Sequence, residues 1–216
     1  MVTHIQCPEP FRPLFEQAEA FLAPIFGDIR RDLHQGALLV GGERYVLNRA
    51  QSLALKLREE LERVAGPAAD SVIYRLGKAL GAADAAHFIA KYPDQEMAFH
   101  LALGPVAFLY MGWAGVTLFP QSNPVPTEDF LLVVEHPDSF EAMAHLEVGH
   151  TSEKCVCYQN AGYAAGWCGQ VFGLTLEAKE LTCRARGDGH CRFITAPPGR
   201  LRERIAEHGD GLRTAP

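Results

Sequence analysis

The sequence has no block of basic residues and no recognisable export signal. Its 216 residues include 20 Lys and Arg against 26 Asp and Glu, which gives a net charge of −6. A chain without a basic patch lacks the electrostatic footprint that grips a phosphate backbone. The first eight residues have neither the charged nor the apolar region of a signal peptide. We therefore expect a cytoplasmic protein with no direct nucleic-acid partner.

Long apolar runs are also scarce. Residues 99–119 form a charge-free stretch that is long enough to cross a bilayer as a helix. Gly104-Pro105 and the glycines at 112 and 115 interrupt that helix, and no basic cluster flanks it. We expect a buried helix running into a buried strand, and no membrane span.

The common cofactor signatures are missing as well. No Gly-x-Gly-x-x-Gly follows a strand into a helix, and no cysteine spacing suits an iron-sulfur cluster. The serines lack the context of a nucleophile elbow. The sequence therefore favours a binding protein over an enzyme, with no nucleotide cofactor and no catalytic residue assigned.

What the sequence does contain is a regular alternation of helical and strand patterns, with 48% hydrophobic residues. Helices are expected at residues 14–23, 49–65, 68–91, 94–104, 140–148 and 158–172, and strands at 37–40, 44–47, 116–119, 130–135, 175–186 and 191–195. This order predicts an α+β fold, an antiparallel sheet packed with helices. We divide it into an N-terminal helical segment (1–35), a ligand-binding domain (36–196) and a tail (197–216) with one or two helical turns.

Five of the six cysteines lie in the last third of the chain. In a reducing compartment they are better interpreted as metal ligands or buried thiols than as disulfides. Cys183 and Cys191 fall on the last expected hairpin, with Glu180 close by, and Cys155 and Cys157 precede the helix before it. Three thiolates and a carboxylate can close a tetrahedral zinc shell. Spacing alone decides neither between metal ligands and buried thiols nor between Cys155 and Cys157.

Residues 157–193 resemble the 4-vinyl reductase domain, whose pattern is Cys, Gly-Tyr, Gly-aromatic, Glu-x-x-Cys and a final Cys. The resemblance implies a zinc site made by Cys157, Glu180, Cys183 and Cys191. Such a closed shell is structural and would staple the C-terminal hairpin. We expect the arginines at 184, 186 and 192 to offset its negative charge.

The resemblance extends upstream to the ligand-sensing domains of phenol-responsive regulators, through residues 37–49, Gly104-Pro105 and residues 138–146. Those regulators also carry ATPase and helix-turn-helix parts, which this chain lacks. A protein of this size with this domain resembles the 4-vinyl reductase proteins of bacteriochlorophyll synthesis in photosynthetic bacteria. That resemblance implies a tetrapyrrole ligand and a partner enzyme of chlorophyll synthesis such as magnesium chelatase.

The same resemblance implies a ligand pocket. Transferred position by position, the phenol-sensor pocket falls on Phe108, Tyr110, Val134, His136 and Trp167. Those sensors anchor the phenol hydroxyl with a histidine and a tryptophan, and the corresponding places here hold Phe108 and His136. The change implies a larger and more apolar ligand.

Further lining is expected from Trp113 and from one face of the helix at 158–172, where Gly162 and Gly166 lie together. Each helical glycine costs about 1 kcal/mol relative to alanine, so this face needs a compensating close contact. The contact is either a neighbouring helix or sheet, or a flat ligand.

The favoured function is therefore a zinc-containing, porphyrin-binding carrier or accessory protein of bacteriochlorophyll biosynthesis. One alternative is a vinyl reductase acting on a divinyl chlorophyll precursor. Another is a sensor module for a small aromatic ligand. We also expect a homodimer, from the resemblance to the sensor domains and because the helix at 14–23 has no obvious partner within the chain.

Overall fold

The computed structural model describes residues 3–213, with side-chain environments up to residue 208. Its helices are α1 (Arg12–Gly27), α2 (Leu57–Ala65), α3 (Ala69–Lys91), α4 (Met97–Tyr110), α5 (Phe140–Glu147), α6 (Tyr158–Phe172) and α7 (Pro198–Arg213). Its strands are β1 (Ile29–Asp32), β2 (Ala37–Val40), β3 (Glu43–Tyr45), β4 (Thr117–Leu118), β5 (Leu132–His136), β6 (Glu177–Thr182) and β7 (Cys191–Ala196). All strand pairs within these two sheets are antiparallel, which confirms the α+β class.

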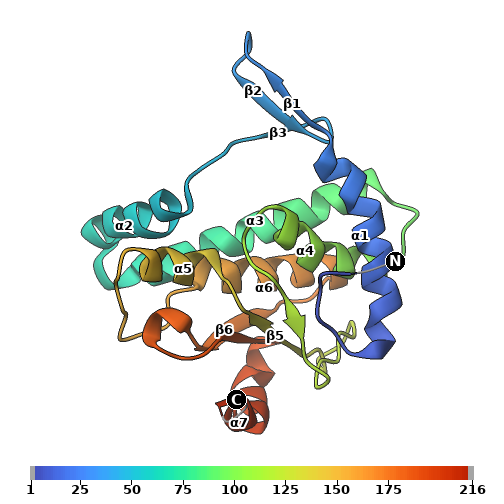
Figure 1. Cartoon of the computed structure of the whole chain (residues 1–216). Helices are drawn as coiled ribbons and strands as arrows, with labels where there is room; N and C mark the ends of the chain where they lie inside the picture. The colour runs from blue at the N-terminus through green and yellow to red at the C-terminus, as the bar shows by residue number, and fades with distance from the viewer. Residues whose placement is uncertain (1–2, 214–216) are drawn as a thin grey trace.

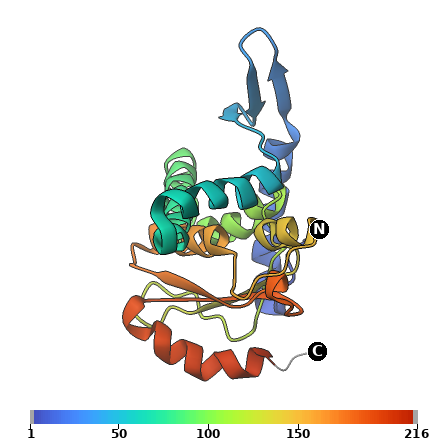
Figure 2. The ribbon, with the colours of Figure 1, turned by 90° about the vertical axis from the view of Figure 1, so that its left-hand side faces the viewer.

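A four-stranded sheet in the order β4-β5-β7-β6 lies at the centre of the domain. Helices cover one of its faces and α7 covers the other (Figures 1 and 2). In β5, Leu132 and Val134 belong to the main core, whereas Val133 packs toward Leu201 and Ile205 of α7. Because both faces are covered, all five residues of β5 are buried. The expected tail therefore contains a longer helix than the one or two turns predicted.

Helices α3 and α6 pack with their backbones in unusually close contact. A Cβ atom at Gly162 or Gly166 of α6 would lie 2.1 or 2.0 Å from a carbonyl oxygen of α3. Conversely, a Cβ atom at Gly77 or Gly81 of α3 would lie 2.2 Å from a carbonyl oxygen of α6. Glycines on both helices therefore allow an approach that alanine would prevent. The close contact required by the glycine face is a neighbouring helix.

Helix α1 packs against α4 and buries Phe15, Ala18 and Leu22 in the main core. The prediction that α1 lacks a partner within the chain is therefore wrong, and that argument for a homodimer is lost. Pro24 lies inside α1 and Pro105 inside α4, although both were expected to end their helices. No helix in the described part of the chain combines the length and apolar character needed to cross a membrane.

The N-terminal strands β1, β2 and β3 form a separate sheet that projects from the body (Figure 1). The predicted hairpin is present, with Gly41 and Gly42 at its turn in left-handed conformations (φ 57° and 86°) that favour glycine. Strand β1 was not predicted, because none of its four residues is buried and its sequence has no apolar alternation. The expected division at residues 35 and 196 stays a prediction.

Candidate metal centre and ligand cavity

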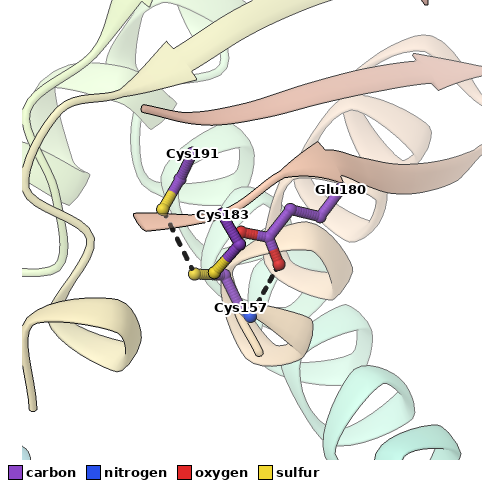
Figure 3. Close-up of side chains that lie close together, drawn as sticks. All are labelled: Cys157, Glu180, Cys183 and Cys191. Atoms are coloured by element: carbon purple, nitrogen blue, oxygen red, sulfur yellow. Dashed lines mark hydrogen bonds between the residues drawn. The ribbon is translucent and has the colours of Figure 1, made fainter. Parts of the chain in front are cut away.

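Four side chains converge at the end of the central sheet where α6 begins. The ligand atoms of Cys157, Glu180, Cys183 and Cys191 all lie within 4.8 Å of one another. Cys157 precedes α6, Glu180 lies on β6, Cys183 follows β6, and Cys191 begins β7. Figure 3 shows the three sulfurs and the carboxylate pointing toward one another. The structure thus brings together the four residues implied by the resemblance.

The carboxylate of Glu180 has one committed oxygen and one uncommitted oxygen. Its Oε2 accepts a hydrogen bond of 2.8 Å from the Cys157 backbone N–H. Its Oε1 is buried and has no hydrogen-bond partner. Burial raises the pKa of Glu180 to about 9, because a buried carboxylate needs a positive partner to stay ionised. A divalent cation between the sulfurs would satisfy Oε1, so the residues fit a tetrahedral metal.

Groups around the cluster hold its sulfurs in place. The Ser139 hydroxyl donates to Cys157 Sγ at 3.1 Å and accepts from the Asn160 side-chain amide at 2.9 Å. The Arg184 backbone N–H donates to Cys191 Sγ at 3.4 Å. The cluster therefore has hydrogen-bonded support outside its four ligands, as metal sites commonly do.

The expectation that arginine side chains offset the charge of the cluster is wrong. The guanidinium groups of Arg184, Arg186 and Arg192 pair with Asp138, Asp188 and Glu135. Because each arginine neutralises a carboxylate outside the cluster, the stabilising contacts to the sulfurs come from a hydroxyl and a backbone amide instead.

Cys155 is not a member of the four-residue group. It is half-buried and lines a cleft beside α3 that also reaches Cys157 and Glu180. Burial raises its pKa to about 12, so the free side chain is a neutral thiol. The structure thus resolves the choice that spacing left open in favour of Cys157.

A small cavity of about 40 Å³ lies between α4, β5 and α6. Four of the predicted pocket residues line it: Phe108, Val134, His136 and Trp167. Trp167 packs close to Gly104, where a Cβ atom would lie 2.6 Å from the indole nitrogen. The absence of a side chain at Gly104 therefore lets the tryptophan form one wall of the cavity.

His136 supplies the one uncommitted side-chain polar atom among the nitrogen- and oxygen-bearing residues that line the cavity. Trp167 Nε1–H donates to the His100 carbonyl at 3.1 Å, and the Tyr163 hydroxyl donates to Asp84 at 2.8 Å. The Nδ1 atom of His136 is buried without a hydrogen-bond partner. Burial lowers the pKa of His136 to about 3, so its imidazole is neutral at physiological pH.

Four predicted pocket residues lie elsewhere. Tyr110 is largely exposed and stacks on Phe26 at a centroid distance of 5.1 Å. Trp113 does not line the cavity but packs behind Phe108, with ring centroids 5.1 Å apart. Gly162 and Gly166 face α3, where close backbone contact leaves no room for a ligand. These four assignments are therefore wrong as cavity lining.

Sequence reasoning missed Tyr163 and Cys168, which also line the cavity. Tyr163 precedes Trp167 by four positions on α6, a spacing that places both rings on one helix face. That spacing was a usable signal. Cys168 had been treated only as a surplus thiol.

The cavity and the metal centre share two structural elements. His136 of β5 pairs with Cys191 of β7 in the sheet. Helix α6 begins directly after Cys157 and carries Tyr163 and Trp167 further along. A metal ion that fixes Cys157 and Cys191 would therefore also fix two walls of the cavity.

Comparisons with known proteins agree with this arrangement. Residues 137–197 match the 4-vinyl reductase domain, and residues 26–120 match a domain described as an activator of aromatic catabolism. The phenol regulator MopR of Acinetobacter guillouiae is 42% identical over 60 residues, which are 28% of this chain and 11% of that protein. The transcriptional regulatory protein XylR of Pseudomonas putida is 26% identical over 161 residues, 74% of this chain and 28% of that protein.

Among solved structures, the phenol-responsive sensory domain of the transcription activator PoxR, crystallised with phenol, has a TM-score of 0.74. The match covers 94% of this chain and 98% of that chain at 24% identity, and shows that the two share a fold. The chain therefore carries a 4-vinyl reductase domain and is related to the sensor domains of phenol-responsive regulators. It spans less than a third of the length of the two curated relatives.

These relatives correct the functional prediction. The assignment to bacteriochlorophyll biosynthesis and photosynthesis is wrong, because the matched proteins are regulators that respond to aromatic compounds. Nothing in the comparisons supports a tetrapyrrole ligand, a magnesium chelatase partner, a vinyl reductase activity or a homodimer. The alternative of a sensor module accounts for the matches better.

Proposed function

We propose that this chain is a ligand-sensing domain that binds a small aromatic molecule beside His136. The observation that carries the proposal is the unpartnered Nδ1 of His136 in a cavity walled by Phe108, Tyr163 and Trp167. Aromatic walls favour a ring, and a buried polar atom without a partner favours a ligand that completes its hydrogen bond. A phenolic hydroxyl can donate to or accept from a neutral imidazole.

The small size of the cavity supports a single-ring ligand over a tetrapyrrole. It holds about 40 Å³, and its neighbours are packed side chains of the core. A cavity of about 150 Å³ takes one benzene ring, so even this ligand requires some movement of the walls. A macrocycle would require the core itself to open.

We also propose that Cys157, Glu180, Cys183 and Cys191 hold a structural zinc ion. Three thiolates favour a soft, redox-inactive ion, and four protein ligands leave no open position for a substrate. The bound ion would neutralise the cluster and hold β6, β7 and the start of α6 together. Elemental analysis of the untreated protein should give one zinc per chain, and the absence of bound metal would refute the site.

The ligand proposal is tested by calorimetric titration of the zinc-bound protein with phenol and with toluene. We expect phenol to bind more tightly, because only phenol satisfies His136. In His136→Leu the preference for phenol should fall by about tenfold, the equivalent of one hydrogen bond of about 1.4 kcal/mol. His34→Leu is the matched control, since His34 is exposed on the turn of the N-terminal sheet. If phenol binds neither protein, or binds His136→Leu and wild type equally, the proposal is wrong.

A further inference from the structure

Beside the cavity is a second hollow, which we call the apolar groove. It has a volume of about 360 Å³ and runs between α1, the start of α4 and the proline-rich loop before β5. Its walls include Leu14, Phe15, Met97, Leu101, Pro124 and Phe172. The groove therefore offers far more space than the cavity and lies along a different side of α4.

The two hollows meet at a shared wall. Pro105, Val116, Leu132, Val134 and Cys168 line both the cavity and the apolar groove. Each of these residues other than Pro105 is buried, so the boundary consists of side chains in the core rather than of solvent. Space is therefore continuous from the surroundings of His136 to the groove when these side chains shift slightly.

The two volumes differ in what they can hold. The cavity, at about 40 Å³, is smaller than the roughly 150 Å³ that accommodates one benzene ring. The groove, at about 360 Å³, falls within the range of about 300 to 1,000 Å³ that is usual for ligand pockets. A ligand whose ring lies at His136 therefore gains its remaining volume by extending toward the groove.

The lining of the groove sets the chemistry of that extension. No Asp, Glu, Lys, Arg or His is among the residues that line it. Burial raises the pKa of Cys168 to about 12, so the thiol at the junction is also neutral. A charged or strongly polar substituent would lose its hydration there without gaining a partner. An alkyl chain loses nothing and buries apolar surface.

From the shared wall and this lining we infer that the ligand is an aromatic ring with an alkyl tail, the ring in the cavity and the tail in the apolar groove. This inference rests on the proposed function, because it assumes that the ring binds beside His136. It adds a second subsite that selects ligands by chain length. The specificity of the domain then lies in Leu101, Phe172 and their neighbours as much as in His136.

The test is a calorimetric series of phenol and 4-alkylphenols with two to eight carbons in the chain, each titrated into the zinc-bound protein. Every methylene that enters the groove should raise affinity by about fourfold until the chain emerges into water. Ala98 lines the groove and is exposed, so Ala98→Trp should narrow it without disturbing the core. The matched control is Ala20→Trp, an exposed alanine on α1 that is not part of the lining.

We expect the gain per methylene to disappear for the longer chains in Ala98→Trp and to persist in Ala20→Trp, while phenol binds all three proteins equally. Phenol binding without any gain from the chain would overturn the tail subsite and leave the proposed function standing. A gain that persists in Ala98→Trp would also overturn it, as nonspecific adsorption. A change of mass in light scattering for Ala98→Trp, with a flat alkyl series, would identify the groove as a protein interface instead. No binding of any phenol would remove the proposed function itself.

Discussion

The metal centre and the ligand cavity lie side by side but are built in opposite ways. The metal centre gathers four acidic groups from a single stretch, residues 157–191, and its ligand atoms already lie within 4.8 Å of one another. The cavity draws apolar walls from α4, β5 and α6, with one uncommitted polar atom on His136. The first arrangement gains stability from a strong, directional partner, whereas the second keeps a weak site ready for an exchangeable one.

This difference predicts unequal responses to substitution. Removing a metal ligand leaves a buried cluster with fewer groups than a closed shell needs, so the cost falls on folding. Changing a wall of the cavity alters a small space among apolar neighbours, so the cost falls on ligand affinity. The following predictions test whether stability and binding separate in this way, beginning with the largest effect.

The largest effect is expected for Cys183→Ser. Loss of one thiolate ligand should lower the free energy of unfolding by about 4 kcal/mol or more, since metal binding contributes directly to folding. For a chain of this size, that corresponds to a fall in melting temperature of about 8 to 16 °C. Differential scanning calorimetry measures it, with Cys7→Ser as the matched control. Equal melting temperatures in the two variants would contradict a structural metal.

The next effect tests the contact between α3 and α6 that carries both sites. In Gly166→Ala the new methyl would lie 2.0 Å from the Lys78 carbonyl oxygen, so the helices must move apart. We expect a loss of about 2 to 3 kcal/mol in chemical denaturation, the usual cost of overpacking a core. Gly189→Ala is the control, because an added Cβ there meets no atom within 4 Å. Wild-type stability in Gly166→Ala would show that α6 can shift without penalty.

The metal centre was the most predictable feature because its chemistry is local. Cys183 and Cys191 flank one hairpin, and the resemblance to a known domain placed Cys157 and Glu180 beside them. The cavity was less predictable because its walls come from separate elements. Phe108, Val134, His136 and Trp167 were transferred correctly, since each lies on an element whose position the fold preserves.

The failures have physical causes too. Tyr110 follows Phe108 by two positions, and on a helix that spacing turns a side chain to a different face, here away from the cavity. Gly162 and Gly166 signalled close contact correctly, but the sequence carries no record of which neighbour approaches. The reciprocal glycines at 77 and 81 supplied that information, because a stripe of small residues on a second helix indicates a partner.

A smaller effect is expected at the border between the two sites, in Ser139→Ala. This change removes the hydroxyl that donates to Cys157 Sγ and accepts from Asn160. We expect a loss of about 2 kcal/mol, typical of a hydrogen bond to a charged group, and a fall of about 10-fold to 100-fold in zinc affinity. Competition with a chromophoric chelator measures the affinity. Ser71→Ala, at an exposed position of α3, is the control, and equal zinc affinity in the two variants would show that the hydroxyl does not support the cluster.

The smallest effect concerns pH and separates His136 from the metal ligands. In the folded protein, burial lowers the pKa of His136 to about 3, whereas the unfolded chain has the ordinary value of about 6.5. As the pH falls below 6.5, the unfolded state therefore takes up a proton that the folded state refuses, and stability declines. Between pH 7 and pH 5.5 the loss should be about 1 kcal/mol from this residue.

His136→Leu should remove that part of the acid sensitivity while leaving any acid release of zinc unchanged. The informative quantity is thus the difference in unfolding free energy between variant and wild type, measured by urea denaturation at pH 7 and at pH 5.5. We expect the difference to shift by about 1 kcal/mol in favour of His136→Leu at the lower pH. In His34→Leu, which changes an exposed histidine, no such shift is expected. If the two variants respond to acid alike, His136 is not held neutral by burial, and the cavity is wetter than its apolar walls indicate.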